Sequence, residues 1–285
     1  MIQMTDRYTI LVQGSAFAES PRWHDGALWW SDMHGHAVYR FSGGRAEQVC
    51  EVAARPSGLG WLPDGRLLVV SMLDKRVLRI ELDGSLTEHA DLSQLAPKRC
   101  NDMVVDRQGR AYVGNFGFEL DAEESPCETV LICVEPDGRS RVVADRLVFP
   151  NGAVIASDGR TFIVAETFAA KLTAFDISAN GDLTNRRTWA YLPIGAVPDG
   201  ICLDSEGAIW VASPSTSECL RISEGGVVLD RITTDQKPYA CALRGDDGRT
   251  LFVCVADSHD PERQRAERNG RIVAYEVAVS GTHRS

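Results

Sequence analysis

The segment DGRLLVVS, from Asp64 to Ser71, joins a polar turn containing glycine to a short apolar strand, and variants of it recur along the chain. Gly accepts the positive φ that primed hairpin turns require, and the residues after it are mostly aliphatic, β-branched or aromatic. Each copy therefore predicts an antiparallel hairpin. The six copies are DGALWWSD from Asp25, DGRLLVVS from Asp64, QGRAYVGN from Gln108, DGRTFIVAE from Asp158, EGAIWVAS from Glu206 and DGRTLFVCVAD from Asp247.

The repeat period indicates the architecture. The copies start 39, 44, 50, 48 and 41 residues apart, and each has a short strand pattern before it, such as GLGWLP, and others after it, such as RVLRIELDG and AEQVCEV. Four-stranded units at this period are typical of a β-propeller, and the long amphipathic helices of a parallel α/β fold are missing from the sequence. The sequence predicts an all-β, six-bladed β-propeller that forms one domain over residues 1–285, with the strand Tyr8 to Val12 closing the last blade.

Composition and charge narrow the function classes. Forty acidic and thirty basic residues give a formal charge of -10, and the basic residues are dispersed, so we expect neither nucleic acid nor membrane as a partner. A small-molecule partner is more compatible with this charge pattern. The N-terminal residues show neither the basic region nor the apolar stretch of a signal peptide, so a soluble cytoplasmic protein is expected. The sequence predicts no oligomeric state.

The cysteines and histidines indicate no metal site of their own. No two of the eight cysteines form a C-x-x-C pair, and most lie in apolar strand patterns, so buried thiols are favoured over disulfides and zinc thiolates. His34 and His36 flank a glycine and are expected in a solvated loop. There is no G-x-S-x-G motif and no convincing Ser-His-Asp set, which argues against an acyl-enzyme.

A ring of residues is expected around the channel, because equivalent positions of a propeller's innermost strands lie at similar depth. Counting back six to eight residues from each turn gives one position in each blade, and four of the six carry a carboxylate or amide oxygen. The residues that end the second strands, such as Asp32 and Glu166, are expected to line loops or the channel wall. The ring positions are Glu19, Ser57, Asn101, Asn151, Asp199 and Tyr239.

Converging hard oxygen ligands suit a divalent cation such as Ca²⁺, Mg²⁺ or Mn²⁺. Glu19, Asn151 and Asp199 form the predicted metal site, and their two formal charges leave coordination positions for water or substrate. Taken singly, any one of these residues is better explained by hydrogen bonds to strand ends and loops. The metal interpretation depends on the set.

Four short segments together resemble the SMP-30/gluconolactonase/luciferin-regenerating enzyme (regucalcin) family. They are AESPRW from Ala18, KRCND from Lys98, FPNG from Phe149 and PDGICLD from Pro198, and they occur in the family's order over nearly the whole chain. The resemblance implies a six-bladed propeller whose metal ligands match Glu19, Asn151 and Asp199. It also implies substrate contacts from Arg99 and Asn101, and from Glu119 or one of its neighbours.

The expected function is metal-dependent opening of a small, sugar-derived lactone. The metal would polarise the lactone carbonyl, and Asp199 is expected to serve as both metal ligand and general base. Ca²⁺ is the first candidate for this metal, with Zn²⁺, Mn²⁺, Mg²⁺ or Fe²⁺ as alternatives. Two alternatives remain open. One is a metal-dependent phosphotriesterase or other esterase, and the other is a non-catalytic propeller that binds metal and protein partners.

Overall fold

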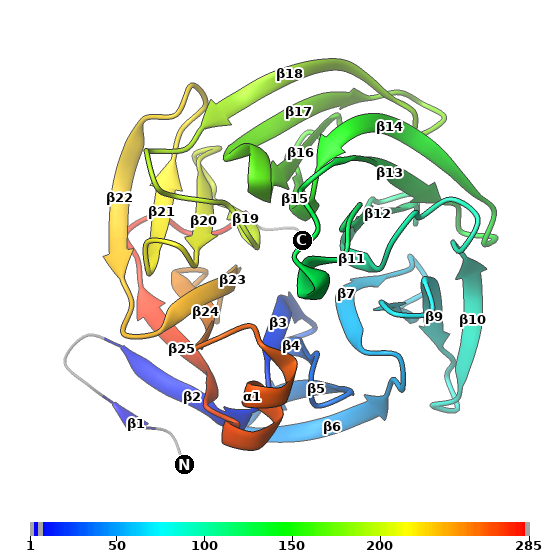
Figure 1. Ribbon diagram of the computed structural model, residues 1–285. Coiled ribbons are helices and arrows are strands. Elements are labelled where there is room, and N and C mark those ends of the chain that lie inside the picture. Colours follow the sequence, from blue (N-terminus) through cyan, green and yellow to red (C-terminus); the bar gives the residue numbers. More distant parts are fainter. Residues whose placement is uncertain (1–2, 5–7, 283–285) are drawn as a thin grey trace.

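The computed structural model describes residues 3–4 and 8–282, and these form six antiparallel sheets around a central axis (Figure 1). This arrangement confirms the predicted six-bladed β-propeller. The first five blades are β3 (Ala18–His24) to β6 (Arg45–Glu51), β7 (Pro56–Trp61) to β10 (Leu86–Asp91), β11 (Cys100–Val105) to β14 (Ser140–Val148), β15 (Pro150–Ile155) to β18 (Leu183–Tyr191), and β19 (Ile201–Leu203) to β22 (Val228–Thr233).

The strands between these bounds complete each blade. They are β4 (Ala27–Asp32), β5 (Ala37–Ser42), β8 (Leu67–Ser71), β9 (Arg76–Ile80), β12 (Ala111–Asn115), β13 (Glu128–Val134), β16 (Thr161–Glu166), β17 (Lys171–Ile177), β20 (Ile209–Ser213) and β21 (Glu218–Ile222). Helical segments are few and short: η1 (Leu120–Ala122), η2 (Thr167–Ala169) and α1 (Pro261–Glu267). No helix among the described residues has the length and hydrophobicity to cross a membrane.

The sixth blade joins the two ends of the chain. It contains β23 (Lys237–Arg244), β24 (Thr250–Ala256) and β25 (Gly270–Glu276), and β2 (Thr9–Ser15) pairs antiparallel with β25. The short strand β1 (Gln3–Met4) adds a fifth member at the outer edge. Pairing of the N-terminal strand with the last blade closes the ring without an unpaired seam between its ends.

The hairpin turns differ in detail from the primed type expected. The first turn has positive φ at two successive residues, Asp25 and Gly26, whereas in the second turn Gly65 alone has it. There the Asp64 carboxylate accepts a hydrogen bond from the Arg66 backbone N–H at 3.1 Å. An Asx interaction followed by glycine thus makes this turn, because a short acidic side chain can bond its own backbone two residues on.

The hydrophobic core lies in the contacts between neighbouring blades. Trp30 and Phe252 belong to one cluster shared by the first and sixth blades, and Trp210 and Val253 to another shared by the fifth and sixth. Trp30 and Trp210 are each only 1% exposed, which places them in the inter-blade core. All eight cysteines are free thiols in the structure, and five of them are buried, whereas Cys127 is exposed.

Candidate active site

The inner strands begin at one end of the central channel, called here the upper mouth, and the repeated hairpin turns lie at the other, the lower mouth. The ring positions fall at the upper mouth, at or just before the start of each inner strand. In five of the six blades the pairing register shifts beside this position, as between Glu19 and Arg22 or between Pro150 and Ala153. β-bulges re-aim side chains, so the repeated bulge gives the ring its common orientation.

Two glycines that follow ring positions bring neighbouring inner strands into close contact. A Cβ on Gly152 would lie 2.6 Å from the Ile201 backbone nitrogen, and one on Gly200 would lie 2.6 Å from the Ala240 Cα. The Gly152 N–H donates to the Asp199 carbonyl oxygen at 3.3 Å. Because a side chain would hold these backbones apart, glycine here allows Asn151 to approach Asp199.

The three predicted metal ligands come from blades one, four and five. Asn151 Nδ2 donates to Asp199 Oδ1 at 2.5 Å and to Thr167 Oγ1 at 3.2 Å. Glu19 is 9% exposed, and its Oε2 accepts the Ser20 backbone N–H at 2.9 Å. The structure therefore joins Asn151 and Asp199 directly, and places the Glu19 carboxylate close enough to Asp199 for the two charges to repel.

Burial raises the pKa values of both carboxyl groups, and neighbouring negative charges raise them further. Burial raises the pKa of Glu19 well above its usual range, and the Asp199 charge raises it further. Burial likewise raises the pKa of Asp199 to about 8, against the opposing hydrogen bond from Asn151. Buried acids with this shift lack a compensating cation.

The arginine whose charge opposes the raised pKa of Glu19 is already paired with another acid. Arg22 donates to Asp102 Oδ1 at 2.7 Å, and the same oxygen accepts the Ser20 hydroxyl at 3.0 Å. Asp102 itself raises the pKa values of Glu19 and Asp199. The donor set, two carboxylates and an amide with excess negative charge, fits a divalent cation.

The predicted ligand set mixes carboxylates with an amide. In the part of the chain that the structure describes, no three His, Cys, Asp or Glu side chains gather closely enough to hold a metal ion. Only Glu19 and Asp199 of the predicted set are of these residue types, and Asn151 would supply the third oxygen ligand.

Two further ring residues carry buried polar atoms without a hydrogen-bond partner among the described residues. They are Asn101 Nδ2 and the Tyr239 hydroxyl, each in a residue that is 5% exposed. Unsatisfied buried groups are uncommon and costly, so groups of this kind at a channel mouth are suited to bind a ligand. Ser57 differs, because its carbonyl oxygen accepts the Ser31 hydroxyl at 2.6 Å and it contributes no carboxylate or amide.

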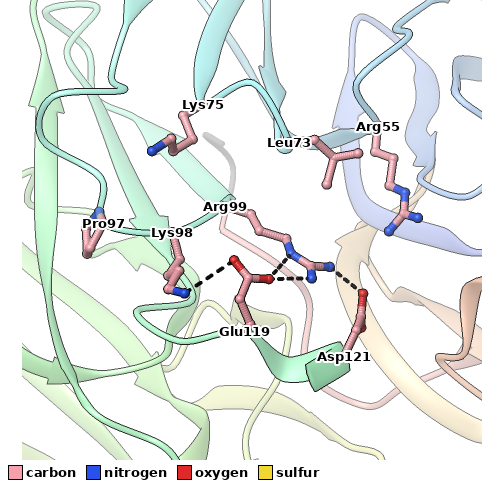
Figure 2. A pocket seen from close by; sticks show the side chains of 8 residues that line it. All are labelled: Arg55, Leu73, Lys75, Pro97, Lys98, Arg99, Glu119 and Asp121. Atoms are coloured by element: carbon pink, nitrogen blue, oxygen red, sulfur yellow. Dashed lines mark hydrogen bonds and ion pairs between the residues drawn. The ribbon is translucent and has the colours of Figure 1, made fainter. Parts of the chain in front are cut away.

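Arg99 and Glu119, both predicted to contact substrate, form an ion pair beside the ring. Arg99 Nη2 lies 2.7 Å from Glu119 Oε2, and Nη1 lies 2.8 Å from Asp121 Oδ2 (Figure 2). The guanidinium carbon also lies 5.5 Å from the centre of the Phe116 ring. Among the acidic residues of the GNFGFELDAEE stretch, Glu119 and Asp121 are thus the two that Arg99 holds in place.

The polar residues that end the second strands have a role that the sequence did not indicate. The Asp32 carboxylate accepts the backbone N–H groups of Ala16 and Phe17, at 3.0 and 2.7 Å. Glu166 Oε2 accepts the Val148 N–H at 2.9 Å. These buried carboxylates fix the segments leading into the inner strands, and so position Glu19 and Asn151.

His34 is not in a solvated loop, and that expectation is wrong. It is 5% exposed, its ring lies 4.9 Å from the Phe17 ring, and Nε2 lies 3.1 Å from the His259 carbonyl oxygen. Burial lowers the pKa of His34 to about 4, so its imidazole is neutral at physiological pH. His283 lies outside the described residues.

Comparison with known proteins now gives the family. A model of the SMP-30/gluconolactonase/LRE-like region matches residues 17–257. Regucalcin of Danio rerio is 26% identical over 87% of this chain and 85% of its own length, and the pentonolactonase of Haloferax volcanii is 26% identical over 92% and 91%.

A solved structure of a calcium-binding protein, regucalcin, from Agrobacterium tumefaciens superimposes with a TM-score of 0.80. It covers 97% of this chain and 95% of its own at 22% identity, a likeness that shows the fold alone. The family model, in contrast, spans most of the sequence. This chain belongs to the SMP-30/gluconolactonase/LRE-like family.

Proposed function

We propose that this protein hydrolyses a small, sugar-derived lactone at the upper mouth of its channel. The observation that carries the proposal is the convergence of buried Glu19 and Asn151 with the partly buried Asp199, on a ring where Asn101 Nδ2 has no hydrogen-bond partner among the described residues. A propeller that only binds proteins gains nothing from mutually repelling carboxylates withdrawn from solvent at its axis. The lactonase named among its relatives supports the same chemistry.

Glu19, Asn151 and Asp199 would hold one divalent cation, for which Ca²⁺ is the first candidate. When bound, this ion supplies a Lewis acid for the lactone carbonyl oxygen. The regucalcin likeness supports a divalent metal without fixing its identity. Two carboxylates and one amide also leave room for water and substrate, as a catalytic rather than structural site requires.

The protein's own groups would orient the lactone and move one proton. Asp199 accepts a proton from the attacking water and returns it to the ring ester oxygen as the bond between that oxygen and the carbonyl carbon breaks, which gives the hydroxy acid. Asn101 Nδ2, free of other partners among the described residues, donates to a substrate oxygen. The Arg99 and Glu119 pair offers donors and acceptors suited to sugar hydroxyl groups.

The test is a panel of substrates on chelated enzyme resupplied with single metals. The panel contains aldonolactones, aliphatic lactones and one phosphotriester, and acid release is followed with a pH indicator. We expect metal-restored turnover of aldonolactones that Asp199→Asn abolishes, while Asp230→Asn, a matched change on the exposed edge strand β22, has no effect. Turnover of the phosphotriester alone would replace this proposal, and no turnover with any metal would favour a binding propeller.

A further inference from the structure

A positively charged pocket lies over blades two and three at the upper mouth, in a protein whose formal charge is -10. Its volume is about 320 Å³, which is within the usual range for small-molecule sites. Four basic and two acidic side chains line it, so the pocket has an excess of positive charge. The charged lining residues are Arg55, Lys75, Lys98, Arg99, Glu119 and Asp121.

Most of these cations are already engaged. Arg99 pairs with both acids, Lys98 Nζ lies 3.7 Å from Glu119, and Lys75 Nζ donates to the carbonyl oxygens of Ser93 and Ala96 at 3.4 and 3.2 Å. Both acids of the lining are therefore used by Arg99 and Lys98. Asp121 also acts on Arg55 electrostatically, but no ion pair joins Arg55 to either acid among the described residues.

Arg55 stands apart from this network in Figure 2, with no dashed line to another side chain. Its Nε is buried and has no hydrogen-bond partner among the residues that the structure describes. A buried donor of a charged group is costly to leave unsatisfied, by about 1–3 kcal/mol or more. An unpaired guanidinium at the edge of a pocket is thus suited to bind an anion.

The backbone gives Arg55 and Arg99 equivalent places on adjacent blades. Each immediately precedes its inner strand, β7 or β11. The Arg55 carbonyl oxygen accepts the Met72 N–H at 2.9 Å, and the Arg99 carbonyl oxygen accepts the Phe116 N–H at 3.0 Å. The two guanidinium groups therefore start from the same depth at the upper mouth.

The local field agrees with this geometry. Burial lowers the pKa of Arg55, and the positive charges of Arg99 and of Arg265 on α1 lower it further, against the opposing charge of Asp121. Repulsion from these two arginines therefore acts on Arg55 with only partial compensation by this acid. A bound anion would relieve this repulsion.

We propose that Arg55 binds an anionic substituent, a carboxylate, phosphate or sulfonate, at the end of the lactone substrate remote from its carbonyl. The inference rests on the proposed function and names its substrate class, an anionic sugar lactone. Guanidinium offers a planar fork of donors that matches each of these groups. Arg55 is then a specificity residue and takes no part in the chemical step.

The test compares lactones of one ring size that carry a terminal hydroxyl, carboxylate, phosphate or sulfonate group. For wild type we expect kcat/KM to be about 10- to 100-fold higher for an anionic lactone than for the neutral one, as one charged hydrogen-bonding pair would give. The group with the highest value identifies the substituent. Arg55→Gln should remove this preference and leave the neutral lactone within about threefold of wild type.

Two further variants test whether the preference for anionic lactones depends on the guanidinium of Arg55. Arg55→Lys keeps the charge without the fork and should recover part of the preference. Arg45→Gln, which removes one charge from an 81% exposed side chain on β6, should keep all of it. An equal loss for anionic and neutral lactones in Arg55→Gln would overturn the proposal in favour of a structural role.

A binding measurement distinguishes failure of the Arg55 proposal from failure of the lactonase proposal. Calorimetry with the hydrolysis products, a sugar diacid and the corresponding monoacid, requires no turnover. We expect wild type to bind the diacid at least about tenfold more tightly and Arg55→Gln to bind both alike. Equal binding of the two acids by wild type would overturn the role of Arg55, whatever the enzyme hydrolyses.

Discussion

At its upper mouth the channel leads to a charged pocket of about 320 Å³, whereas at its lower mouth it opens into a cavity of about 760 Å³. The larger cavity is lined mainly by apolar side chains such as Trp61, Ile155 and Leu243. Its buried charges are satisfied, since Asp106 and Arg110 pair at 2.6 Å.

The upper mouth has the opposite character. Glu19 and Asp199 repel there, and Asn101, Tyr239 and Arg55 each hold a buried polar atom without a partner among the described residues. The difference teaches that unbalanced polar groups, rather than cavity size, distinguish the candidate active site from the other mouth. Substitutions at the two mouths should accordingly separate activity from stability.

The largest expected effect is on turnover at the upper mouth. Glu19→Gln removes one negative charge from the predicted metal site, and we expect kcat/KM for the best lactone to fall by about 10³-fold, because loss of a well-placed electrostatic contact costs about 10²- to 10³-fold. The free energy of unfolding of the chelated protein should not fall, since Glu19 and Asp199 repel. Steady-state kinetics and urea unfolding test both parts, and unchanged turnover would remove Glu19 from the site.

Gly152→Ala should disturb the upper mouth through the backbone alone. Its Cβ would lie 2.6 Å from the Ile201 nitrogen, so blades four and five must separate and Asn151 must move from Asp199. We expect about a 10²-fold loss of kcat/KM, consistent with an approximately 1 Å displacement of a reacting group. Gly159→Ala, in a turn with no neighbour within 4 Å but with positive φ, controls for backbone strain and should leave kcat/KM within a fewfold.

At the lower mouth the expected effect is on stability instead. Leu243 is 6% exposed and packs in the core between blades five and six. Leu243→Ala should lower the free energy of unfolding by about 2–4 kcal/mol, because it leaves a cavity. Turnover measured well below the melting temperature should stay within about threefold of wild type, and a selective loss of turnover would show that the two mouths are coupled.

The smallest expected effect is a pH dependence due to His34. Its folded-state pKa of about 4 lies below its usual 6.5, so between these values the unfolded chain binds a proton that the folded chain does not. Stability should therefore fall as pH drops from 6.5 to 4, by at most about 1.4 kcal/mol for each pH unit from this group. His34→Gln should flatten this part of the stability profile in chemical unfolding, and an unchanged slope would show that other groups cause it.

Much of the ring could be predicted from the sequence, because each blade repeats one turn phrase six to eight residues after one inner-strand position. That distance placed Glu19, Asn151 and Asp199 at one level without reference to their contacts. The PNG and PDG segments also carried the glycines that allow close approach. Repetition thus converts spacing along the chain into depth in the fold.

Contacts made by loops between blades could not be predicted in this way. Burial of His34 depends on the His259 carbonyl oxygen, 225 residues away, and engagement of Arg99 depends on how the segment after β12 returns to the mouth. Arg55 precedes an inner strand just as Arg99 does, but its lack of a partner among the described residues became visible only in three dimensions. Such pairings leave no periodic pattern in the sequence.

The most direct test of the central claim is an anomalous difference map from crystals of chelated protein soaked with Mn²⁺. We predict one strong peak at the upper mouth, within ligand distance of oxygen atoms of Glu19, Asn151 and Asp199, and no peak in Asp199→Ala crystals soaked in the same way. A peak elsewhere, or the same peak in the Asp199→Ala crystals, would contradict the account.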